Sequence, residues 1–322
     1  MFKKIFFIII IFFNLFPQII YADDEFIELD LSSNELNETL QTSMSVENIP
    51  NINARHAIVL DRNSNTILYA KKEQETCKMA STTKIMTAII VIENANLNDT
   101  VTISTKSAKT GGSRLGLSTG NTITVENLLY GLMMRSGNDA AVALAEYVGG
   151  SIEGFSDLMN KKAFELGLTS THFVTPHGLD NDNHFTTAYD LALLTNYALS
   201  NSTFSKIVKT KTYIITLNGY PKTLSNTNEL LGNLNGVYGV KTGFTNGANR
   251  CLVTSCKRGN LDIICVVLGC DTKKDRTKDS INLINYIFKN YTVVNLKDII
   301  ENDFNKWNKE HSNSFIINKG IR

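Results

Sequence analysis

Ser81 and Lys84 are the two residues whose types and spacing most directly suggest catalysis. Three residues apart on a helix, their side chains lie on one face, about 5–6 Å apart at Cβ. A serine hydroxyl is a weak nucleophile until an adjacent base takes its proton. A lysine can be that base when burial or a nearby positive charge lowers the pKa of its amine. A capping serine followed by a surface lysine has the same spacing, so the pair alone is a weak signal for acyl transfer.

Two further motifs supply groups that such a site needs. Residues 136–138 read Ser-Gly-Asn between two predicted helices, where Asn138 alone is explained as a helix N-cap. Residues 241–243 read Lys-Thr-Gly at the end of a predicted strand, where a lysine is usually solvated. In this order, on a helix start, a turn and a strand end, the three motifs match the S-x-x-K, S-x-N and K-T-G pattern of serine enzymes that react with penicillin. Their combination favours acyl transfer over the separate structural explanations.

The elements that would position these motifs follow a strand, helix, strand order. Alternating apolar residues predict a hairpin of His56–Leu60 and Thr66–Ala70, and strands return at 213–217, 236–241, 251–256 and 261–268. Helical periodicity predicts helices at 81–94, 124–134, 138–147, 152–166, 187–199 and about 274–288, with Thr187 and Asp190 as a capping box. This order differs from the β-α alternation of a parallel sheet. It predicts an α/β fold in which helices flank an antiparallel sheet, with a helical subdomain inserted at about 81–200.

The sequence around all three motifs resembles the serine-type D-alanyl-D-alanine carboxypeptidases, the low-molecular-weight penicillin-binding proteins of the S11 peptidase type. The resemblance runs from about Ala54 to Phe288. It rests on the segments Ala80–Ala88, Leu132–Ala141, Pro176–Leu179, Thr187–Ala192, Gly239–Thr245 and Val266–Gly269. It implies the β-lactamase and penicillin-binding-protein fold, removal of the terminal D-Ala from peptidoglycan stem peptides, and covalent inhibition by β-lactam antibiotics. It implies no cofactor.

The resemblance also assigns catalytic roles. Ser81 attacks the carbonyl of the penultimate D-Ala and becomes acylated, and Lys84 takes its proton. Ser136 relays that proton to the leaving amine. Asn138 holds Lys84 or the substrate backbone. The identity of the base in these enzymes is disputed, so the role of Lys84 is an expectation to be tested.

A second group of residues is expected to bind the substrate. By the same resemblance, Lys241 supplies positive charge, and Thr242, followed by Gly243, hydrogen-bonds the terminal carboxylate of the substrate. The backbone N–H of Phe244 completes an oxyanion hole together with that of the nucleophile. Arg276 stands where an arginine of the family helps to hold the carboxylate.

Three other functions fit the same fold. A β-lactamase needs rapid attack of water on the acyl-enzyme, usually aided by a glutamate. Glu165 is the one tempting candidate for that role, although an exposed helical glutamate is the simpler explanation. A D,D-endopeptidase that cuts cross-links is poorly separated by sequence. A catalytically inert wall-binding protein is expected to lose Ser81 or Lys84, and both are present.

The histidines and cysteines do not suggest a metal or a disulfide framework. His56, His172, His177 and His184 have no zinc-ligand spacing such as H-E-x-x-H, so no metal is expected. Five cysteines, an odd number, lie mostly in strand-like apolar segments, where a free cysteine behaves as a small hydrophobe.

The ends of the chain suggest export. Two lysines and an apolar stretch near the start predict a signal peptide over 1–22, with an uncleaved membrane anchor as the alternative. Residues 23–50 hold eight acidic residues and no Lys or Arg, which indicates a solvated linker. The catalytic domain is expected at 51–290, followed by a short tail at 291–322. The net charge of +1 gives no reason to expect a nucleic-acid partner, and the site of action is predicted to lie outside the cytoplasmic membrane.

Overall fold

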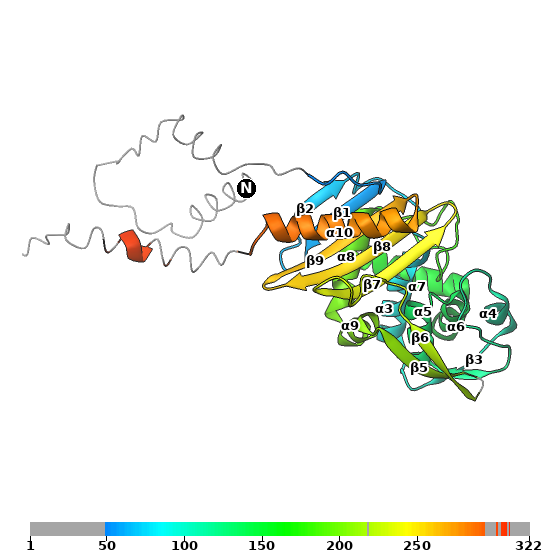
Figure 1. Ribbon diagram of the computed structural model, residues 1–322. Helices are drawn as coiled ribbons and strands as arrows, with labels where there is room; N and C mark the ends of the chain where they lie inside the picture. Colours follow the sequence, from blue (N-terminus) through cyan, green and yellow to red (C-terminus); the bar gives the residue numbers. More distant parts are fainter. Residues whose placement is uncertain (1–48, 218, 294–300, 302–303, 308, 310–322) are drawn as a thin grey trace, which may run out of the picture. The chain divides into compact units, whose positions relative to one another are not determined.

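The structure, a computed structural model, describes residues 49–217, 219–293, 301, 304–307 and 309 (Figure 1). The predicted signal peptide and nearly all of the predicted linker lie outside the described residues, as does most of the predicted tail. Among the residues that are described, no helix is long and apolar enough to cross a membrane. Nearly all of the described residues belong to one compact domain that begins at Pro50.

A five-stranded antiparallel sheet forms one half of this domain, with the strand order β2-β1-β9-β8-β7. Its strands are β1 (His56–Asp61), β2 (Ile67–Lys71), β7 (Val237–Thr245), β8 (Asn249–Arg258) and β9 (Leu261–Cys270). Strand β9 is apolar along most of its length and buried at every position, as expected for a central strand covered on both faces. Helix α10 (Lys273–Asn290) lies across one face of the sheet (Figure 1) and buries Leu283, Ile284 and Ile287 against it.

A group of helices forms the second half. Its members are α3 (Lys84–Asn94), α4 (Thr105–Lys109), α5 (Val125–Met134), α6 (Asn138–Gly149), α7 (Ile152–Glu165), α8 (Ala188–Ser200) and α9 (Ser202–Lys209). Two of them, α8 and α9, pack against the sheet. Two small hairpins accompany them, β3 (Thr100–Thr102) with β4 (Thr122–Thr124), and β5 (Thr212–Leu217) with β6 (Tyr220–Ser225). Helix α3 is buried from Lys84 to Val91 because the other helices surround it. A lysine at its first position therefore enters the interior of the protein.

The sequence predicted the long elements and missed the short ones. The first hairpin, the four long helices α5 to α8, the three C-terminal strands and α10 all occur close to their expected positions. Helices α4 and α9 and strands β3, β4 and β6 were not predicted, because segments of three to eight residues carry little periodicity. The residues expected to begin one continuous helix at Ser81 instead form a short 3-10 turn, η1 (Ala80–Thr83), which leads directly into α3.

Two predicted local details were wrong. Asn138 does not cap α6 with its side chain; Gly137 is the N-cap residue, and Asn138 is the first residue of the helix. Thr187 does cap α8, accepting a hydrogen bond from the N–H of Asp190. The carboxylate of Asp190, however, accepts from Ser170 and Thr171 in a neighbouring loop instead of completing a capping box.

All five cysteines are free, as the odd count suggested. Four of them are buried in β8 and β9, and burial raises the pKa of Cys251 and of Cys256 to about 11. Burial likewise raises the pKa of Cys77 to about 12. These thiols are therefore protonated at neutral pH and act as packing groups.

Candidate active site

The three motifs meet around the amine of Lys84. Its Nζ lies 2.8 Å from Ser81 Oγ, 2.8 Å from Asn138 Oδ1 and 2.7 Å from the backbone oxygen of His177. These partners come from η1, from the first residue of α6 and from the loop before α8. The contact predicted between the side chains of Ser81 and Lys84 is therefore present in the folded chain.

The surroundings of Lys84 favour the neutral amine. The side chain is fully buried, and burial is the largest cause that lowers its pKa well below the usual value. The positive charge of Lys241 lowers the pKa further, and Asp139 opposes these effects. A neutral amine has two N–H groups and one lone pair. Asn138 Oδ1 and the His177 carbonyl accept the two N–H groups, which leaves the lone pair for the Ser81 hydroxyl.

The carboxylate whose charge acts on this amine, that of Asp139, is already hydrogen-bonded to other groups. Asp139 accepts hydrogen bonds from the backbone N–H groups of Leu115, Gly116 and Leu117, at 2.8, 2.8 and 3.0 Å. Gly137 lies close beside it: a Cβ at this position would be 2.9 Å from Asp139 Oδ1 and 3.1 Å from Leu115 N. Asp139 thus holds the loop above the site, and in the described chain no carboxylate forms an ion pair with Lys84.

Strained backbone on both sides of the site is held by specific contacts. Ala80 has φ 48° and Ser136 has φ 56°, left-handed values that cost roughly 1–2 kcal/mol for residues other than glycine. The Thr83 hydroxyl donates to Ala80 O at 2.8 Å, and His184 Nε2 lies 2.8 Å from that hydroxyl. Gly178 packs so closely that a Cβ there would lie 1.9 Å from Ala80 O. These contacts fix the turn that presents Ser81.

Lys241 lies inside a strand, so the prediction that its strand ends here was wrong. Strand β7 continues to Thr245 and pairs with β8 along its length. The side chain of Lys241 is buried and not solvated, and its Nζ donates to Ser136 Oγ at 3.0 Å and to Thr242 O at 2.8 Å. Burial, with the charge of Arg276 as a smaller cause, lowers the pKa of Lys241 to about 7.

Gly243 brings the sheet against the nucleophile. A Cβ at this position would lie 3.2 Å from Ser81 N and 3.2 Å from Ala80 Cβ, so the absence of a side chain permits the close approach of β7 to η1. The next residue, Phe244, has a partly exposed side chain whose ring centroid lies 3.6 Å from the guanidinium carbon of Arg250. The two backbone N–H groups expected to form an oxyanion hole therefore belong to neighbouring segments.

Thr242 and Arg276 lie on the α10 side of β7. The hydroxyl of Thr242 is 2.8 Å from that of Thr227. Arg276 comes from α10, is buried, and donates through Nη2 to Glu229 Oε1 at 3.3 Å. Its positive charge is one of the causes that lower the pKa of Lys241. Glu229 was not singled out in the sequence, because it lies in a loop and belongs to no motif.

The glutamate and histidine side chains considered in the sequence contribute no side-chain hydrogen bond to Lys84. Glu165 ends α7, where it forms a 3.1 Å ion pair with Lys162. Burial lowers the pKa of His177 to about 3 and that of His184 to about 4, so both imidazoles are neutral. Within the described residues, no group of three or more His, Cys, Asp or Glu side chains could hold a metal ion. The carbonyl of His177 is the functional group that the sequence did not reveal.

Comparisons with known proteins identify the family and the fold. The family model described as D-alanyl-D-alanine carboxypeptidase matches residues 42–272. The chain is 38% identical over 244 residues to the D-alanyl-D-alanine carboxypeptidase DacF of Bacillus subtilis, covering 74% of this chain but only 63% of that one. It is 37% identical to a D-alanyl-D-alanine carboxypeptidase of a Streptomyces species, covering 74% and 88% of the two chains. The crystal structure of a Streptomyces DD-transpeptidase is 36% identical, with a TM-score of 0.73 over 76% of this chain and 100% of that one. The predicted fold class is thereby confirmed.

Proposed function

This chain belongs to the D-alanyl-D-alanine carboxypeptidase family of serine peptidases, and from that membership we propose that it removes the terminal D-Ala from peptidoglycan stem peptides. The observation that carries the proposal is the contact between Lys84 Nζ and Ser81 Oγ at 2.8 Å, with both N–H groups of a neutral amine bound elsewhere. A lysine in that state can accept the serine proton. The chain spans less than two thirds of the length of DacF.

In the acylation step, the proton of Ser81 Oγ moves to Lys84 Nζ as Oγ bonds to the carbonyl carbon of the penultimate D-Ala. The bond from that carbon to the leaving nitrogen then breaks, and the nitrogen takes up the proton that Lys84 received, which releases D-Ala and restores the neutral amine. Ser136 can pass this proton on, because Lys241 donates to its oxygen at 3.0 Å and leaves the Ser136 proton free to point elsewhere. Water then hydrolyses the ester, with the lysine amine acting again as base.

The substrate is held from the sheet side. Lys241 and Arg276 place positive charge near the carboxylate of the terminal D-Ala, and Thr242 offers a hydroxyl from the strand between them. The N–H groups of Ser81 and Phe244 are proposed to bind the oxyanion, since preorganised backbone donors stabilise charge that develops in the transition state. Gly243 keeps these two donors on adjacent segments. β-Lactam antibiotics would acylate the same serine.

We propose that the enzyme works outside the cytoplasmic membrane, where its wall substrate lies. The basic and apolar segment at 1–22 supports export. Retention of that segment would associate the protein with the membrane, and its removal would release the protein. The N-terminal sequence of protein isolated from cells separates the two outcomes.

Mass spectrometry with a stem pentapeptide ending in D-Ala-D-Ala, and separately with penicillin, tests the proposed reaction. The expected results are loss of one D-Ala from the peptide and a long-lived penicilloyl adduct on Ser81, both absent in Ser81→Ala. Rapid turnover of penicillin without D-Ala release would favour the β-lactamase. Cleavage of cross-linked dimers in preference to free stems would favour the endopeptidase, and no adduct at all would leave an inert wall-binding protein.

A further inference from the structure

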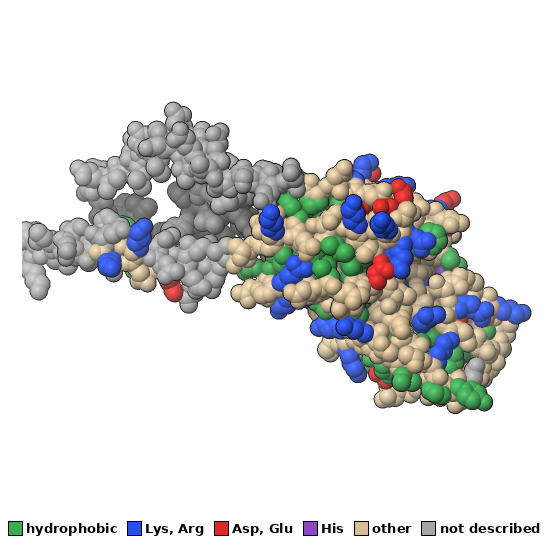
Figure 2. Space-filling model, viewed as in Figure 1, with side chains coloured by type: hydrophobic (Ala, Val, Ile, Leu, Met, Phe, Trp, Pro, Cys, Tyr) green, Lys and Arg blue, Asp and Glu red, His purple; other side chains and the backbone are tan. Residues whose placement is uncertain are grey.

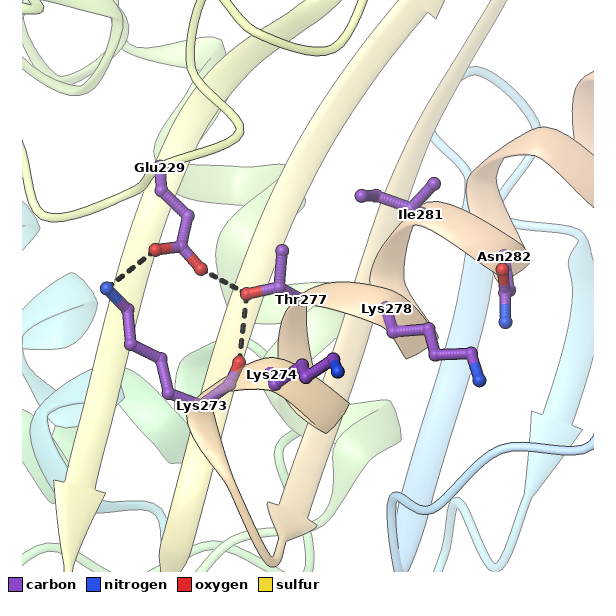
Figure 3. A pocket seen from close by; sticks show the side chains of 7 residues that line it. All are labelled: Glu229, Lys273, Lys274, Thr277, Lys278, Ile281 and Asn282. Carbon is purple, nitrogen blue, oxygen red and sulfur yellow. Dashed lines mark hydrogen bonds and ion pairs between the residues drawn. The ribbon is translucent and has the colours of Figure 1, made fainter.

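One carboxylate, Glu229, gathers three donors from the start of α10. It lies in the loop between β6 and β7, and its Oε2 is 2.7 Å from Lys273 Nζ. Its Oε1 accepts from Thr277 Oγ1 and from Arg276 Nη2, the latter at 3.3 Å. Figure 3 shows the carboxylate between Lys273 and Thr277, while Lys274 points away from it. Lys and Arg side chains gather over this helix in Figure 2. Glu229 is an acidic side chain among them, and it forms ion pairs with Lys273 and Arg276.

The guanidinium of Arg276 is only partly used by this contact. Arginine binds a carboxylate best through two parallel N–H bonds. Here Glu229 offers Arg276 one oxygen, because Lys273 holds the other. The Nε of Arg276 is buried and has no hydrogen-bond partner among the described residues. A buried donor without a partner is costly, so Arg276 keeps capacity for a second carboxylate.

Glu229 is ionised when the enzyme works. Its partial burial alone would raise the pKa of the carboxyl group, but hydrogen bonds from Lys273 and Thr277, together with the charges of Arg276 and Lys273, hold the pKa below its usual value. A fixed negative charge therefore sits on the arginine that is proposed to receive the carboxylate of the substrate. Two carboxylates that share one guanidinium repel each other.

We propose that Glu229 is a specificity-determining residue, a resident counter-ion of Arg276 with which the terminal carboxylate of the substrate must compete. In the empty site it keeps the buried guanidinium paired and in position, because an unpaired buried charge is costly. In the occupied site it weakens the binding of ligands that end in a carboxylate. This inference rests on the proposed role of Arg276 in substrate binding.

Glu229→Gln tests the inference, because it keeps the shape and one oxygen acceptor while removing the charge. The dissociation constant of a peptide ending in D-Ala-D-Ala is measured in the Ser81→Ala background, where no turnover occurs. We expect it to fall about fivefold, the size typical of one partly exposed ion pair. In the enzyme with Ser81 intact, KM should fall by a similar factor while kcat stays constant. A purely structural role would lower the melting temperature and leave this split between KM and kcat unseen.

Two further variants make the test specific. Glu165→Gln removes a similarly exposed, lysine-paired glutamate from the end of α7 and should leave the dissociation constant unchanged. In an Arg276→Leu background, Glu229→Gln should give no gain, because the shared guanidinium is gone. Unchanged or weaker peptide binding in Glu229→Gln would overturn the inference. Absence of D-Ala release by the wild-type enzyme would overturn the proposed function instead, and the binding comparison separates the two failures.

Discussion

The helical side and the sheet side of the site each bury a basic side chain, but only the sheet side pairs it with a carboxylate. On the helical side, Lys84 contacts three neutral polar groups and no carboxylate within the described chain, and its pKa is lowered strongly. On the sheet side, Arg276 is equally buried but contacts the carboxylate of Glu229. Lys241 lies between them with neutral partners and a pKa of about 7.

Under the proposed function, the contrast explains how one site holds both a base and a receptor for an anion. Desolvation disfavours the charged form of any buried group. Where the chain supplies no counter-ion, a lysine gives up its proton and becomes a base. Where the chain supplies a counter-ion, or where the group is an arginine that does not deprotonate, the charge persists and can bind a carboxylate. The positions of the carboxylates therefore determine, as much as those of the lysines, which buried group acts as a base and which binds an anion.

Among the variants considered, removal of the proposed base should lower the rate of acylation most. Lys84→Ala is expected to lower the rate of acylation by roughly 10²–10⁴-fold, the usual contribution of a general base. Stopped-flow measurement with fluorescent penicillin gives the rate directly. The matched change Lys162→Ala removes a lysine paired on the surface with Glu93 and Glu165 and should leave the rate unchanged. A near-normal rate in Lys84→Ala would refute the assignment of the base.

A carboxylate placed next to Lys84 should keep this lysine charged, as Glu229 does for Arg276 on the sheet side. In Asn138→Asp, an anion would face Lys84 Nζ at the distance now held by Oδ1, 2.8 Å. An opposite charge this close raises the pKa of a lysine by about 1–3 units. Acylation at neutral pH should fall on the order of 100-fold and recover as the pH is raised.

The same variant also loses the donor from Asn138 Nδ2 to Gly111 O, so its melting temperature should fall as well. Asn138→Ala, which lacks both the charge and the donor, separates the two causes. A loss of rate in Asn138→Asp that does not recover at higher pH would argue against the electrostatic explanation.

On the sheet side, Thr242→Val should weaken recognition of the carboxylate. The change removes the hydroxyl and keeps the shape, and a hydrogen bond to a charged group contributes about 1.5–3 kcal/mol, so kcat/KM should fall at least tenfold. The control is Thr227→Val, which removes the partner of that hydroxyl at the more exposed position. An equal loss in both variants would indicate that the pair supports the loop and does not bind substrate.

The smallest effect should be the pH dependence of binding. Lys241 carries its charge below its pKa of about 7 and loses it above. The KM for a peptide ending in D-Ala-D-Ala should therefore rise about threefold as the pH goes from about 6 to about 9, within the range expected for one charge. Lys241→Met should show a flat profile over the same range. A KM that falls with increasing pH in the wild-type enzyme would contradict the sign of this assignment.

Sequence reasoning predicted the convergence of the site better than its details. The motif at Ser81 and Lys84 predicted the nucleophile contact because both ends of that contact are side chains at a fixed helical spacing. It could not predict the carbonyl of His177, since a backbone acceptor leaves no trace in the residue type. It placed Lys241 at a strand end, whereas in the structure β7 continues to Thr245 and Gly243 allows close packing against the turn before Lys84.

On both sides of the site, some contacts could not be predicted from the sequence. Asn138 was expected to cap α6, because that is the common use of asparagine before a helix, and only the folded chain shows its contact with Lys84. Glu229 acquires a role only through residues of α10, more than 40 positions later. Long-range contacts between loops and helices are set by tertiary packing, which local periodicity does not report.

The most direct test of the central claim is the rate of Ser81 acylation at saturating penicillin as a function of pH, where binding no longer limits the rate. A base must be neutral to act, so the rate falls as the pH drops through the pKa of Lys84. Because burial and the charge of Lys241 lower that pKa well below the usual value, we expect the rate to reach its plateau far below pH 10. A rate that keeps climbing through about pH 10, as for an ordinary lysine, would contradict the account.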